Sequence, residues 1–170
     1  MIRALTILGL DPGLRHTGWG VIAQDGNRLS FVAAGRISPA ANIPIASRLL
    51  ELAEGIAAVA ARYKPDEAAI EETFVNANAR SALALGQARG AALLALAQAG
   101  LPVSDYAANR IKQTVTGHGH ADKGQIAAMI GMLLPVSGKL AADAADALAV
   151  AITHAHHCGG NTLLARARKA

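Results

Sequence analysis

The sequence predicts an α/β fold with a five-stranded mixed sheet and helices on both faces, and three observations lead to this prediction. Three strand-like segments follow one another near the start of the chain, as in a meander. Two more short strand-like segments each come after a long helical segment, as in sheets whose strands are joined by helical crossovers. Hydrophobic residues make up 52% of the 170 residues and aromatic residues 3%, so one core of Ala, Leu, Ile and Val is expected.

The first half of the chain contains most of the expected strands. Residues 5–10 form an apolar run that ends at Asp11-Pro12-Gly13, which is typical of a buried strand followed by a turn. Residues 19–23 and 29–37 are predicted as two further strands, because Asp25-Gly26-Asn27 between them is a hairpin turn signal.

The remaining elements are mainly helices. Apolar residues recur with helical spacing after Ser47, which we expect to cap the first helix. Asp122 is a similar N-cap candidate later in the chain. The expected helices are residues 47–62, 79–99, 108–115, 122–134 and 140–157, and the two remaining strands are residues 67–71 and 103–106.

The chain is expected to form one domain over residues 1–157, followed by a mobile basic tail over residues 158–170. The tail begins with Cys158 and the Gly159-Gly160-Asn161 segment. A single cysteine excludes an internal disulfide and fits a reducing cytoplasm. No apolar run approaches the roughly 18 residues that a membrane helix needs, and no signal peptide is visible, so a cytoplasmic location without a membrane is expected.

The net charge of +4 favours a polyanionic partner, although a slightly basic protein without such a partner has the same charge. Against this basic background, four of the 12 acidic residues stand in apolar surroundings: Asp11, Glu71, Asp143 and Asp146. Burying a carboxylate is costly unless a partner compensates the charge, and a divalent metal ion compensates several carboxylates at once. A metal-dependent phosphodiesterase site is therefore one hypothesis.

Each acid also has a structural explanation. Asp11 before Pro-Gly is common in turns, and the carboxylates of Asp143 and Asp146, three residues apart on a helix, suit the positive end of the helix dipole. Alternation along a strand puts Glu71 and Glu72 on opposite faces, so spacing alone leaves open which of them faces a site.

The ordered set of motifs resembles the RuvC family of Holliday-junction resolvases, over roughly residues 5–157. The resemblance rests on segments spread along the whole chain. They are Ile7-Leu8-Gly9-Leu10-Asp11-Pro12-Gly13, Thr17-Gly18-Trp19-Gly20-Val21-Ile22, Ala69-Ile70-Glu71, Ser81-Ala82-Leu83-Ala84-Leu85-Gly86-Gln87-Ala88-Arg89-Gly90, Ile111-Lys112-Gln113-Thr114-Val115, Asp122-Lys123 and Ala142-Asp143-Ala144-Ala145-Asp146-Ala147-Leu148-Ala149.

The resemblance implies an RNase H-like fold in which the first and fourth strands are neighbours and Glu71, rather than Glu72, joins the other three acids. It implies an endodeoxyribonuclease that resolves four-way DNA junctions by paired symmetric nicks in recombination and repair, leaving 5′-phosphate and 3′-hydroxyl ends. The four acids would hold two Mg²⁺ ions, with Mn²⁺ as a substitute. The implied partners are a second copy in a homodimer and the RuvAB branch-migration complex.

The resemblance also implies DNA contacts. Lys112 and Lys123 are expected at phosphates, and Phe74 is expected to stack on or wedge between bases, although lysines are more often solvated and phenylalanines more often lie in the core. Arg80 and Arg89 are further candidates. Relatives have a lysine near Ala77, and Arg80 is expected to offset its loss.

Three further functions fit parts of the sequence. An actin-like phosphotransferase also has an Asp-x-Gly near its first strand, but it needs two domains and has no role for the Asp143 helix. A junction-binding protein without catalysis and an RNase H-like nuclease acting on RNA-containing substrates would both share the fold.

The sequence contains no Walker-type motif for nucleotide phosphates. His154, His156 and His157 are expected at a solvated helix end rather than in a zinc site.

Overall fold

The computed structural model describes residues 3–72, 78–135 and 140–167, with side chains up to residue 157. Its five strands are β1 (Leu5–Asp11), β2 (Thr17–Asp25), β3 (Arg28–Ile37), β4 (Glu67–Glu71) and β5 (Val103–Tyr106). They form one mixed sheet in the order β3-β2-β1-β4-β5. The first three strands pair antiparallel, and β4 joins β1 and β5 in parallel. The expected fold and the pairing of the first and fourth strands are confirmed.

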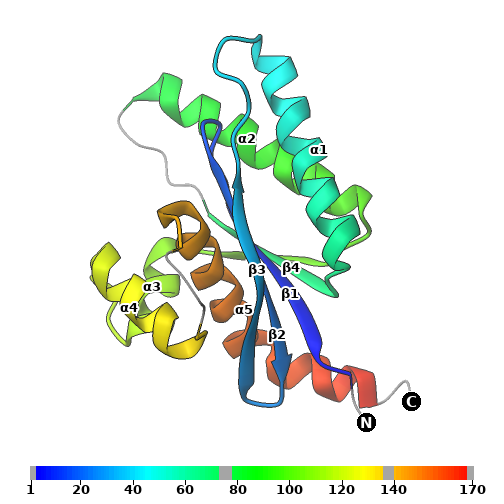
Figure 1. Cartoon of the computed structure of the whole chain (residues 1–170), viewed down its shortest axis with the longest axis vertical. Coiled ribbons are helices and arrows are strands. Elements are labelled where there is room, and N and C mark those ends of the chain that lie inside the picture. The colour runs from blue at the N-terminus through cyan, green and yellow to red at the C-terminus, as the bar shows by residue number, and fades with distance from the viewer. Residues whose placement is uncertain (1–2, 73–77, 136–139, 168–170) are drawn as a thin grey trace.

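Helices cover both faces of this sheet, as Figure 1 shows. Helices α1 (Ile45–Tyr63) and α2 (Ala79–Gln98) pack on one face, and α5 (Ala142–Ala167) packs on the other with α3 (Ala108–Thr116) and α4 (Lys123–Leu133) beside it. Each face therefore has its own apolar core. Within the described residues, no helix is both long enough and apolar enough to cross a membrane.

Alternation along the strands decides which face each acid joins. In β1, Ile7 belongs to the core under α5, while Leu8 and Leu10 belong to the core under α1 and α2. Odd-numbered residues of β1 thus face α5, and Asp11 continues that series. In β4, Ala69 faces α5 in the same way, so Glu71 also lies on the α5 side.

Helix ends agree only partly with the sequence-based expectations. Asp122 caps α4 in a capping box with Gln125, as expected. The expected cap at Ser47 is wrong, because α1 begins at Ile45 after Pro44 and has no side-chain cap. The expected helix end at His157 is also wrong: α5 continues to Ala167. Strong helix formers resume after the Gly-Gly pair and offset its cost of about 1 kcal/mol per glycine.

Glycines let α5 approach the sheet closely. A Cβ atom on Gly9 would collide with the backbone oxygen of Ala147, and one on Gly18 with the backbone oxygen of Asp143. A Cβ atom on Gly20 would lie 2.7 Å from the side chain of Leu148. The start of α5, which bears Asp143 and Asp146, therefore lies directly against the strands that lead to the acidic end of the sheet.

We expect Gly9→Ala to lower the free energy of unfolding by about 1–3 kcal/mol, because the new methyl group must displace α5. Gly131→Ala is the control, since its Cβ meets nothing within 4 Å in α4. This change should raise stability by roughly 0.5–1 kcal/mol. Urea unfolding of both variants measures the difference, and equal effects would contradict the close approach of α5.

Candidate active site

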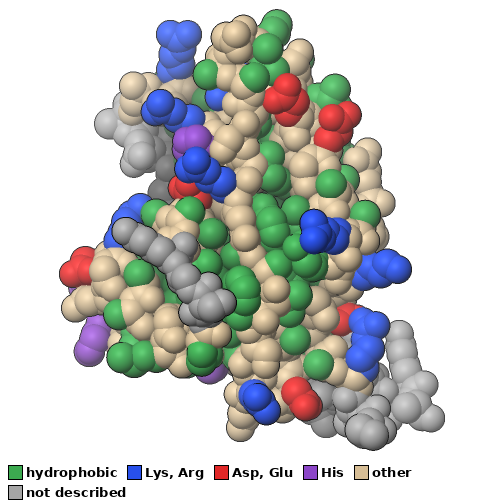
Figure 2. Space-filling model, in the orientation of Figure 1, with side chains coloured by type: hydrophobic (Ala, Val, Ile, Leu, Met, Phe, Trp, Pro, Cys, Tyr) green, Lys and Arg blue, Asp and Glu red, His purple; other side chains and the backbone are tan. Residues whose placement is uncertain are grey.

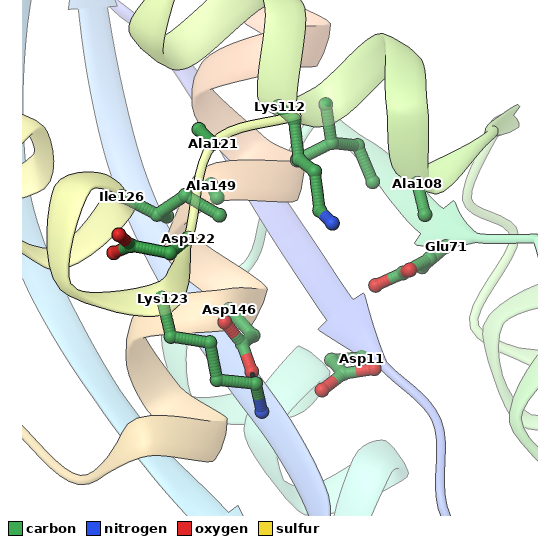
Figure 3. Close-up of a pocket in the computed structure, with 11 residues that line it drawn as sticks. Asp11, Glu71, Ala108, Lys112, Ala121, Asp122, Lys123, Ile126, Asp146 and Ala149 are labelled. Carbon is green, nitrogen blue, oxygen red and sulfur yellow. Dashed lines mark ion pairs between the residues drawn. The ribbon is translucent and has the colours of Figure 1, made fainter. Parts of the chain in front are cut away.

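Three of the four acids that the sequence singled out, each from a separate element, line one cavity at the end of the sheet. Asp11 ends β1, Glu71 ends the parallel neighbour β4, and Asp146 lies on the second turn of α5. The cavity, of about 520 Å³, also contains Lys112 of α3 and Lys123 of α4. Figure 3 shows the three carboxylates and both ammonium groups turned toward a common space. The arrangement brings together most of the residues that the sequence singled out.

Burial and mutual repulsion raise the proton affinity of these acids. Desolvation, followed by the charges of Glu71, Asp146 and Asp143, raises the pKa of Asp11 from 3.8 to about 7. Desolvation is also the largest cause that raises the pKa of Glu71 and of Asp146. The lysines act in the opposite direction, with Lys123 lowering the pKa of all three acids. The cavity is therefore a site that would favour an additional cation.

Asp143 differs from the other three acids. It does not line the cavity, and its Oδ2 lies 3.9 Å from Nη1 of Arg36. Its charge nevertheless contributes to the raised pKa of Asp11. Asp146 also contacts a cation, with 3.6 Å between its Oδ2 and Nζ of Lys123. Both acids of the α5 pair thus have a basic neighbour.

The donor set fits a hard divalent cation. Carboxylate oxygens are the ligands that Mg²⁺ and Mn²⁺ prefer, and Asp11, Glu71 and Asp146 present such oxygens around one open cavity. As the side chains stand, no three His, Cys, Asp or Glu residues of the described chain are close enough to form a complete ligand cluster.

The expected DNA-contacting residues fall at different places. Lys112 and Lys123 line the acidic cavity. Arg80 is exposed on the first turn of α2, where Asn78 caps the helix, and does not line the cavity. Arg89 forms an ion pair with Asp105 of β5, so its charge already has a partner within the chain. Phe74 lies outside the described residues.

The sequence analysis missed Arg36, the basic residue beside Asp143. Residues 29 and 31 of β3 pack in the core under α5, so simple alternation would place residue 36 on the opposite face. The pairing of β2 with β3 contains an irregularity between Val21 and Ile22, after which Arg36 stands opposite Gly18. This shift turns Arg36 toward α5, and no turn or alternation signal in the sequence reveals it.

The fold and the comparisons with known proteins define the class of this protein: a nuclease with an RNase H-like fold. The family described as crossover junction endodeoxyribonuclease RuvC matches residues 7–154. A relative of that name in Azorhizobium caulinodans is 61% identical over 159 residues, which cover 94% of this chain and 92% of the relative. One in Bradyrhizobium sp. (strain ORS 278) is 57% identical over 160 residues, which cover 94% of this chain and 91% of the relative.

Among solved structures, Thermus thermophilus RuvC in complex with a Holliday junction substrate is similar. It has a TM-score of 0.86 and 32% identity, with 93% of this chain and 97% of the other covered. The chain belongs to the RuvC family of crossover junction endodeoxyribonucleases. The function expected from the sequence, Holliday-junction resolution by a nuclease, is confirmed at the level of the family, whose nucleases are metal-dependent.

We expect Asp11→Asn to change the pH dependence of stability in EDTA. Because the folded-state pKa of Asp11 is raised from 3.8 to about 7, the folded protein holds a proton that the unfolded chain releases. Asp11 therefore destabilises the wild type progressively as pH rises from about 4 to about 7. Urea unfolding at pH 5 and pH 8 should show the variant gaining stability relative to wild type at the higher pH. A pH-independent difference would contradict the raised pKa.

Proposed function

We propose that this chain cuts four-way DNA junctions by paired symmetric nicks, using Asp11, Glu71, Asp143 and Asp146 to hold two Mg²⁺ ions. The observation that carries the proposal is the cavity in which three of these carboxylates meet two lysines. When bound, the two ions would activate a water and stabilise the leaving 3′ oxygen, giving 5′-phosphate and 3′-hydroxyl ends. Mn²⁺ would serve as a substitute because it accepts the same oxygen ligands.

The residues of the chain have separate tasks in this proposal. Asp11 and Glu71 are fixed at the ends of adjacent parallel strands, so their spacing is set by the sheet. Asp143 and Asp146 approach from α5, and Asp143 would exchange its contact with Arg36 for a place in the ligand set. Lys112 and Lys123 would hold the phosphate and balance charge that develops in the transition state.

A DNA junction as substrate is supported by the similar T. thermophilus protein, which was solved with a Holliday junction. Basic side chains suit such a polyanion, and Figure 2 shows Lys and Arg spread over the visible face rather than gathered at one point. Phe74, outside the described residues, remains the candidate for base stacking. Arg80 is a candidate phosphate contact, whereas the ion pair of Arg89 with Asp105 favours a structural role.

A homodimer would place two sites on one junction. The exposed face of α2 suits this assembly: Leu83 and Leu94 are 64% and 58% exposed, and Gly86 and Gly90 lie between them with open space beside each. Small residues between apolar ones allow close contact with a second helix. Two-fold symmetry would then direct two cuts to strands of like polarity. The RuvAB complex is proposed as a further partner in the cytoplasm, on the basis of the family resemblance.

One assay separates this function from two different ones. A labelled mobile four-way junction, a linear duplex and an RNA–DNA hybrid are incubated with Mg²⁺ or with EDTA. Symmetric nicks in the junction alone, only with Mg²⁺, support the proposal. Cutting of the hybrid would instead indicate a nuclease for RNA-containing substrates, and metal-independent binding without cutting would indicate a junction-binding protein.

We expect Asp146→Asn and Glu71→Gln each to abolish junction cutting while junction binding in EDTA persists, because each loses a charged metal ligand and keeps its shape. Glu72→Gln is the matched control, since Glu72 is exposed beyond the end of β4. It should cut like wild type in a gel assay with Mg²⁺. Robust cutting by either of the first two variants would reject the assignment of these acids.

We expect Lys112→Ala and Lys123→Ala each to weaken binding to all junction sequences similarly. Each should lower the slope of log affinity against log salt concentration by about 1, because one phosphate contact is lost. Arg28→Ala is the control: Arg28 is exposed at the end of β3 remote from Arg36 and the acids. Titrations at several salt concentrations measure the slopes, and unchanged slopes for both lysine variants would contradict phosphate contact.

A further inference from the structure

A buried histidine lies on α5 outside the acidic cavity. His154 is 2% exposed and stands among apolar residues of the core under α5. The expectation that it lies at a solvated helix end is therefore wrong, because α5 continues to Ala167 and packs across the sheet at this point. A buried imidazole is costly unless both of its nitrogens have hydrogen-bond partners.

Both ring nitrogens have such partners, and the partners belong to two different strands. Nε2 lies 2.7 Å from Oε2 of Glu67 on β4, and Nδ1 lies 3.1 Å from the hydroxyl of Tyr106 on β5. Since a carboxylate only accepts, the matching tautomer donates from Nε2–H to Glu67 and accepts at Nδ1 from the Tyr106 hydroxyl. The Tyr106 ring also meets the imidazole edge to face, with 5.8 Å between centroids.

These contacts connect the elements that bear the acids. Glu67 and Glu71 are the two ends of β4 and lie on the same face of the sheet. Tyr106 is the residue of β5 that stands opposite Glu71 in the parallel register. His154 follows Asp146 by eight residues on α5, or about 12 Å along the helix. One side chain thus joins the helix that carries two acids to the strand that carries a third.

The acids at the far end of α5 work against this attachment. Asp146 of α5 lines the same cavity as Asp11 of β1 and Glu71 of β4, so like charges of the helix and the strands face one another there. Close packing on Gly9, Gly18 and Gly20 sets how near α5 can come. The hydrogen bonds of His154 to β4 and β5 add directional contacts to this packing, and they fix the position of the helix relative to both strands.

We propose that His154 is a positioning residue that, through Glu67 and Tyr106, fixes α5 on β4 and β5 and so holds Asp143 and Asp146 in place opposite Glu71 and Asp11. This role rests on the proposed metal-dependent function of the four acids. His154 touches neither the acids nor the cavity, so it acts on metal binding only through the position of the helix.

The test compares three variants of the full chain by calorimetric titration with Mn²⁺, by junction binding in EDTA and by thermal unfolding. His154→Phe removes both hydrogen bonds, and Tyr106→Phe removes one without leaving a cavity. His156→Phe is the matched control, because His156 is exposed two residues further along α5. The Mn²⁺ dissociation constant is the decisive quantity, since a merely stabilising contact would lower the melting temperature and leave metal affinity unchanged.

We expect His154→Phe to raise the Mn²⁺ dissociation constant on the order of tenfold, as loss of supporting contacts does at metal sites. Tyr106→Phe should raise it less, and His156→Phe should match wild type, with junction binding in EDTA unchanged throughout. Wild-type Mn²⁺ affinity in folded His154→Phe, or in Tyr106→Phe if the former does not fold, would overturn the proposal. Failure of the wild type itself to bind Mn²⁺ would overturn the metal site, and the positioning role with it.

Discussion

The close contact between α5 and the first two strands is the constraint on which the rest of the structure depends. Gly9, Gly18 and Gly20 remove the side chains that would hold the helix away, so the backbone of α5 lies on the sheet at Asp143 and Ala147. This contact brings two acids of a C-terminal helix to the ends of strands formed much earlier in the chain. A larger residue at any of these glycines would displace α5, and with it Asp143 and Asp146.

Bringing the acids together has an electrostatic cost that the surrounding residues offset. Lys112 and Lys123 enter the cavity from α3 and α4, while Arg36 approaches Asp143 from β3 on the other side of α5. Exposed ion pairs of this kind contribute little stability, so their main effect is on the local potential. Acids that are buried, mutually repelling and only partly compensated favour binding of divalent cations, which is consistent with the metal-dependent nucleases of this family.

The middle of α5 balances this arrangement. There His154 forms hydrogen bonds with Glu67 of β4 and Tyr106 of β5, the two strands that follow β1 in the sheet order. The charges of Asp143 and Asp146 on α5 are thus only partly compensated at the cavity, where chemistry is proposed. At His154, where none is proposed, hydrogen bonds attach the helix to the sheet. Fixing the helix at His154 would hold Asp143 and Asp146 in place opposite Glu71 and Asp11.

The sequence by itself determined the order of the elements and the class of fold, because strand alternation and turn residues are local signals. It also singled out four acids as isolated charges in apolar surroundings. Alternation along the strand left open whether Glu71 or Glu72 lies on the face of the other acids. Ala69 packs in the core under α5, so Glu71, two residues further on, lies on that face. Only the tertiary structure decided that Arg36 reaches Asp143, since a register shift in β3 reverses its face, and that His154 is buried, since α5 runs past the predicted end. The position of Arg36 and the burial of His154 both depend on contacts with residues distant in sequence, and no local sequence pattern encodes such contacts.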